Sequence, residues 1–111
     1  MADVLTSTFA DLTTSDPTVL TAGSGETLTI IGCNIANVHA STAAWVTVTV
    51  YASGGGTNAV LCKEVSIPIN DAFNPILGKL ILTTGMYIKM DAQANSSLEV
   101  TISYFCLLYT S

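Results

Sequence analysis

The sequence predicts an all-β fold, a single two-sheet antiparallel β-sandwich of jelly-roll-like form with about eight strands. Apolar residues alternate with polar ones in several segments, and no segment keeps the period of a helix. Gly, Pro, Asn, Asp or Ser residues separate these segments at short intervals, as turns separate strands. A chain of 111 residues can build one hydrophobic core but not two, so we expect one domain over residues 1–111.

The N-terminal part of the chain supplies the first expected strands. A weakly alternating segment leads into a loop rich in Ser, Thr and Asp that reaches Pro17, and a short strand follows near Val19. The complete set of expected strands covers residues 4–9, 18–22, 26–37, 45–52, 59–67, 76–82, 86–92 and 98–108.

The long apolar segment 26–37 does not keep one alternation throughout. Its apolar residues fall out of step on either side of Gly32, with Leu28 and Ile30 before it and Cys33 and Ile35 after it. A one-residue slip at a glycine is typical of a β-bulge, which we therefore expect at Gly32.

The clearest strand signal is the alternation that ends at Tyr51. Three valines, Val46, Val48 and Val50, share one face, and Trp45, Thr47, Thr49 and Tyr51 share the other. Three consecutive glycines within residues 53–58 predict a flexible loop that joins this strand to the segment 59–67 as a hairpin.

Two more strands are expected on either side of Gly85. The second of them places Met86, Ile88 and Met90 on one face, alternating with Tyr87, Lys89 and Asp91. Because a tight turn at Gly85 separates the segments 76–82 and 86–92, we expect them to pair as a hairpin.

The last strand, 98–108, is apolar on both sides in its second half. One row continues the core from Leu98, while the other changes from polar residues to Phe105, Leu107 and Tyr109. A strand with one face in the core is normally polar on the other, so these three side chains need a second cover. We expect a subunit or partner contact there; the alternative is that the N-terminal segment folds over them.

Outward-facing aromatic residues add a second candidate surface. Trp45 and Tyr51 are expected to contribute to a protein interface, because aromatic residues are enriched at such contacts. The same residues, together with Tyr87, could instead stack on a sugar ring, which leaves a carbohydrate-binding module as an alternative function.

The charge of the chain argues against two classes of partner. Its formal net charge is -5, with three lysines, Lys63, Lys79 and Lys89, and no arginine. We therefore expect no nucleic-acid partner, because phosphate binding needs clustered Lys and Arg. No apolar run is long enough to span a bilayer, and the start of the sequence, residues 1–5, carries no basic region ahead of an apolar one. We therefore expect no membrane association and synthesis in a cytoplasm.

Catalytic and metal-binding patterns are missing from the sequence. Cys33, Cys62 and Cys106 are too few and too widely spaced for a zinc site with the single histidine, His39, and each lies in an apolar run like a buried hydrophobic residue. We expect no metal, no cofactor and no enzymatic activity.

Several segments together resemble the small β-sandwich proteins that decorate or staple phage capsids. The resemblance is carried by residues 25–31, 34–37, 46–50, 67–69 and 79–85. In its length and its small share of charged residues, 10%, the chain is most similar to the capsid staple proteins of short-tailed phages of the epsilon-fifteen type.

The resemblance implies a structural virion protein, made in the host cytoplasm and bound to the outer surface of the capsid. It implies two partners, the major capsid protein and a second copy of the chain, with a homodimer bridging neighbouring capsid subunits. A phage tail or fibre accessory protein is the alternative within the same class.

Overall fold

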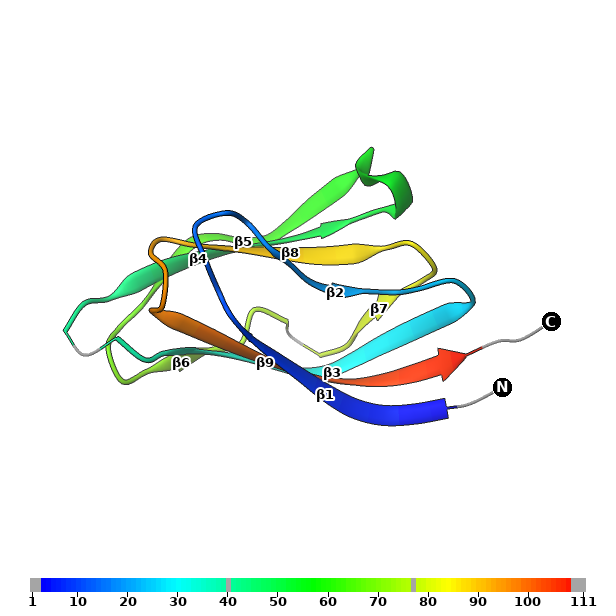
Figure 1. Ribbon diagram of the computed structural model, residues 1–111, viewed down its shortest axis with the longest axis horizontal. Coiled ribbons are helices and arrows are strands. Elements are labelled where there is room, and N and C mark those ends of the chain that lie inside the picture. The colour runs from blue at the N-terminus through cyan, green and yellow to red at the C-terminus, as the bar shows by residue number, and fades with distance from the viewer. Residues whose placement is uncertain (1–2, 40, 77, 109–111) are drawn as a thin grey trace.

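The computed structural model describes residues 3–39, 41–76 and 78–108, which form two antiparallel sheets packed face to face (Figure 1). Sheet A has the order β1-β9-β3-β6, with β7 also paired to β3, and sheet B has the order β2-β8-β4-β5. The strands of sheet A are β1 (Asp3–Asp11), β3 (Glu26–Asn37), β6 (Ala72–Phe73), β7 (Leu80–Leu82) and β9 (Leu98–Leu108). Those of sheet B are β2 (Thr18–Thr21), β4 (Ala44–Tyr51), β5 (Asn58–Ile67) and β8 (Tyr87–Ala92).

The chain repeatedly crosses between the two sheets, which gives the sandwich its jelly-roll-like form. Strands β1, β3, β7 and β9 belong to one sheet, and β2, β4, β5 and β8 belong to the other. The predicted all-β sandwich is confirmed, and the eight predicted strands match observed ones. The additional strand, β6, has only two residues and is too short for an alternating pattern to reveal.

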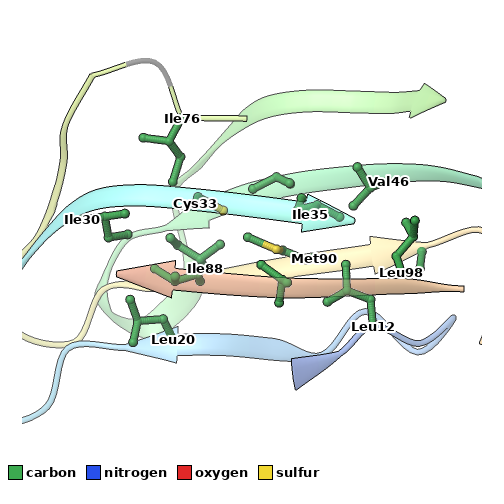
Figure 2. Packing of buried hydrophobic residues seen from close by; sticks show 14 of the residues in the cluster. Leu12, Leu20, Ile30, Cys33, Ile35, Val46, Ile76, Ile88, Met90 and Leu98 are labelled. Carbon is green, nitrogen blue, oxygen red and sulfur yellow. The ribbon is translucent and has the colours of Figure 1, made fainter. Parts of the chain in front are cut away.

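The core lies between the sheets and is built by the predicted inward-facing rows (Figure 2). Val46 and Val48 of β4 and Ile88 and Met90 of β8 are fully buried from one side. Sheet A supplies the other side with the fully or almost fully buried residues Leu28, Ile30, Cys33, Ile35, Leu82, Leu98, Val100 and Ile102.

The predicted bulge in β3 is confirmed. The register between β3 and β9 shifts between Ile30 and Gly32, and the apolar residues on both sides of the shift are buried. The extra residue lets the inward row resume at Cys33. It also leaves Ile31 47% exposed on the outside of sheet A.

The predicted hairpin around Gly85 is wrong. Strand β7 pairs with β3 in sheet A, whereas β8 pairs with β2 and β4 in sheet B. The tight turn itself is present: the Met86 amide donates to the Thr83 carbonyl at 2.9 Å, and Gly85 has a φ of 87°. Alternation cannot tell a turn within a sheet from one that crosses the sandwich, because both place one row of apolar residues inside.

The glycine-rich loop between β4 and β5 is more constrained than its composition indicates. Residues Ser53–Gly55 form a 3-10 turn, and the Ala52 amide donates to the Thr57 carbonyl at 2.8 Å. Gly55 has a φ of 77°, and a Cβ atom there would lie 2.6 Å from the Tyr87 hydroxyl. Glycine is therefore required at this position by conformation and by space.

One buried polar side chain joins the end of β3 to the neighbouring segments. The Asn37 amide group donates to the carbonyl oxygens of Thr42 at 3.1 Å and Ile67 at 2.9 Å. Its side-chain oxygen accepts from the His39 amide at 2.9 Å. Asn37 thus satisfies backbone groups that would otherwise be unpaired near the core.

Candidate interaction surfaces

The predicted interface residues lie on two opposite outer faces of the sandwich. Phe105 and Leu107 are half-buried on the outside of sheet A, and Trp45 and Tyr51 are half-buried on the outside of sheet B. Tyr109 lies outside the described residues. The structure therefore does not bring the candidates into one site, and each face must be considered separately.

The N-terminal segment does not fold over Phe105 and Leu107. Strand β1 lies beside β9 within the same sheet, and its register places Leu5 opposite Phe105 and Thr6 opposite Tyr104 (Figure 1). The alternative cover considered for the last strand is therefore wrong. Pairing along the edge of β9 leaves the outer face of sheet A uncovered by β1.

A row of three apolar side chains and one threonine, called here the apolar row, crosses the outer face of sheet A from one side to the other. Leu5 of β1 is opposite Phe105 of β9, Phe105 is opposite Thr29 of β3, and Thr29 is opposite Ile81 of β7. Leu5 is 67% exposed and Ile81 is 55% exposed. Residues directly opposite one another in antiparallel strands project from the same face, so the register makes these side chains neighbours.

Two further apolar residues enlarge this row. Leu107 lies two residues beyond Phe105 on the same face, and the bulge turns Ile31 outward. Ile31 lines a surface depression of about 270 Å³ together with Leu5 and Ser103. We refer to Leu5, Ile31, Ile81, Phe105 and Leu107 as the outer patch.

Three members of the outer patch were not identified from the sequence. Leu5, Ile31 and Ile81 lie in a weak strand, at a bulge and in a three-residue strand, respectively. The bulge at Gly32 was a usable signal, because the extra residue beside it has to leave the inward row. The neighbour relationship between Leu5 and Phe105 depends on the β1–β9 pairing, which alternation does not specify.

Contacts within the chain occupy part of the outer face of sheet B. The rings of Tyr51 and Tyr87 stack with centroids 4.9 Å apart and planes at 5°, and Lys89 Nζ lies 5.6 Å from the Tyr51 centroid. The Glu64 amide donates to Thr47 Oγ1 at 2.9 Å on the same sheet. The ring faces that the two tyrosines turn toward each other are not available to a sugar.

The cysteine thiols behave as parts of the hydrophobic interior. Burial, and secondarily the charge of the Cys62 thiolate, raise the pKa of the Cys33 thiol from 9.0 to about 12. Burial also raises the pKa of the Cys62 thiol. A protonated, enclosed thiol is a poor nucleophile and a poor metal ligand.

Within residues 3–39, 41–76 and 78–108, no three side chains of His, Cys, Asp or Glu gather as metal ligands would. None of the elements in those ranges is a helix of the length and apolar character needed to cross a membrane.

A comparison with protein-family models finds no match, and a comparison with curated proteins also finds none.

Proposed function

We propose that this chain is a structural virion protein that binds the outer surface of a phage capsid and staples neighbouring major capsid protein subunits. The observation that carries the proposal is the outer patch. It is an apolar surface on one side of a rigid sheet, and no other strand of the described chain covers it. Exposed apolar patches of this kind mark protein contacts.

The outer patch can contribute several kcal/mol to a protein contact. Burying one large apolar side chain is worth roughly 1.5 to 3 kcal/mol, before the cost of association is subtracted. Leu5 and Ile81 have most of this gain available, since more than half of each side chain is exposed. Phe105 and Leu107 are half-buried and would contribute less per residue.

The low charge of the chain supports a permanent partner. Charged residues make up 10% of the sequence, whereas soluble domains ordinarily contain about 25%. A surface with so few charges is better suited to a protein that stays assembled than to a free monomer. The capsid setting itself is supported by the resemblance of five sequence segments to capsid staple proteins.

The proposal is tested by mass spectrometry of purified virions. We expect the chain to be present at a ratio to the major capsid protein within a few-fold of equality. A handful of copies per particle would contradict stapling and indicate a tail or fibre component. Absence from virions, with glycan binding by the isolated protein, would contradict the virion role and indicate a carbohydrate-binding module.

A further inference from the structure

Sheet edges differ in how well they are protected against pairing with another chain. Sheet A ends on one side in β6 and β7, which have two and three residues, and sheet B ends on one side in β2, which has four. Short edge strands offer few backbone groups to a second chain. The long edges are β1, with nine residues, and β5, with ten.

Strand β5 carries features that hinder pairing along its free edge. Its register with β4 shifts between Val46 and Val48 and again between Val48 and Thr49. Glu64 in this strand has a φ of 51°, outside the extended region, and Lys63 precedes it. Bulges and lysines are the devices that natural proteins use against edge-to-edge association.

Strand β1 shows none of these protective features. It pairs with β9 without a register shift from Asp3 to Asp11, and between these two ends it contains no charged residue and no proline. Its position at the end of the sheet leaves the side away from β9 free within the described chain. Every second residue of such an edge directs its backbone N–H and C=O groups outward, where they can pair with another strand.

We propose that β1 pairs antiparallel with β1 of a second copy, about a two-fold axis that passes between the Ser7 residues of the two copies. Ser7 lies at the centre of the strand, so the two strands overlap along most of their length. The pairing joins the two copies of sheet A into one continuous sheet. The proposal concerns the isolated protein in solution and does not require a capsid.

The apolar side chains of β1 favour this register, whereas its two ends oppose it, because Asp3 of each copy lies opposite Asp11 of the other and like charges directly opposite are destabilising. With Ser7 opposite Ser7 of the second copy, Leu5 of each copy is opposite Phe9 of the other on the outer face. Leu5 is 67% exposed and Phe9 is 80% exposed in the single chain. Side by side, these two side chains remove part of each other's apolar surface from water. The register forms this pair twice, once on each side of the axis, so two of the most exposed apolar residues gain partners.

The dimer has a consequence for stapling, which rests on the proposed function. Directly opposite residues of antiparallel strands project from the same face, so both outer patches lie on one side of the joined sheet. One dimer would then present two identical apolar surfaces in the same direction. That arrangement suits contact with two neighbouring, identical capsid subunits.

The first test is oxidative crosslinking of the purified protein. Ser7→Cys should form a covalent dimer, because Cα atoms of directly opposite residues lie about 4.5 to 5.5 Å apart, within disulfide range. Asp11→Cys is the matched control on the same strand and face. In the proposed register the two Asp11 positions are eight residues apart along the strand, roughly 27 Å, and cannot be bridged. The unsubstituted chain gives the baseline from its own three cysteines.

The second test is sedimentation velocity over a range of concentrations, without capsids. We expect a dimer that Leu5→Lys weakens by about tenfold or more, and that Val60→Lys leaves unchanged. Val60 is 53% exposed on β5, so it controls for an added lysine at a comparable apolar position.

A monomer at all concentrations, or a covalent dimer of Asp11→Cys in place of Ser7→Cys, would overturn the proposed pairing. Neither result depends on whether the chain is found in virions. The proposed function, which mass spectrometry of virions tests, can therefore fail or hold independently of the proposed pairing.

Discussion

Leu5 and Phe105 lie directly opposite each other on the outer face of sheet A, one on the edge strand and one on the strand beside it. Their pairing explains why the last strand is apolar on both sides. The inner row of β9 belongs to the core, and the outer row belongs to a surface that continues across β3 to Ile81. Leu5 therefore shields Phe105 from one side. The rest of the outward surface of Phe105 stays exposed, where a partner can bind.

Asn37 is predicted to be important for stability because it is buried and fully engaged. Replacing it with alanine removes two donors and one acceptor, leaving the carbonyls of Thr42 and Ile67 and the His39 amide without this partner. We expect Asn37→Ala to lower the free energy of unfolding by about 1 to 3 kcal/mol. Urea denaturation measures the change.

The control for this substitution is Asn34→Ala on the same strand. Asn34 is exposed, and surface substitutions usually change stability by about 0.5 kcal/mol or less. Equal effects at the two positions would show that the hydrogen bonds of Asn37 do not carry the stability assigned to them.

The adjacent glycines Gly55 and Gly56 are predicted to respond differently to alanine. Gly55→Ala meets both a φ of 77° and the Tyr87 hydroxyl, so we expect a loss of about 1 to 3 kcal/mol. Gly56 has a φ of -73° and open space around it, so Gly56→Ala should be neutral or slightly stabilising. Thermal unfolding followed by circular dichroism measures both. A melting temperature lowered equally by both substitutions would argue against the constrained loop.

The Cys33 thiol is predicted to make stability fall at alkaline pH. Its pKa is about 12 in the folded chain and 9.0 ordinarily, so between these values the folded chain retains a proton that the unfolded chain loses. This thiol therefore stabilises the fold fully below pH 9, and its contribution is lost as the pH rises toward 12. Between these two pH values the free energy of unfolding falls with a slope that approaches about 1.4 kcal/mol per pH unit.

Comparison with Cys33→Ala isolates this contribution from other groups that titrate in the same range. The free energy of unfolding of the variant should decline less steeply between pH 9 and 11 than that of the unsubstituted chain. Parallel pH profiles would mean that Cys33 is not held protonated by burial.

Strand positions and inward-facing rows could be predicted from the sequence because they depend on local alternation. Val46, Val48, Ile88 and Met90 point into the core as the period of two requires. The slip at Gly32 could also be predicted, since a bulge changes the pattern within one strand.

Strand partners could not be predicted in the same way. The chain between Leu82 and Tyr87 reads as a hairpin turn, yet it crosses from one sheet to the other. The outer patch was only partly foreseen for the same reason: Phe105 and Leu107 stood out within their own strand, but Leu5 and Ile81 join them only through pairing.

The most direct test of the central claim is co-sedimentation of the Ile81→Lys variant with capsids that lack this chain. Ile81 is 55% exposed at one end of the apolar row, so a lysine there should leave the melting temperature nearly unchanged. Because about half of this side chain is already buried, the substitution removes roughly 0.8 to 1.6 kcal/mol of apolar burial, which corresponds to binding about fourfold to fifteenfold weaker. Val60→Lys, on the opposite sheet, should bind like the unsubstituted chain. Full binding by Ile81→Lys would contradict the assignment of the outer patch as the capsid-binding surface. Loss of binding by Val60→Lys but not by Ile81→Lys would contradict it as well.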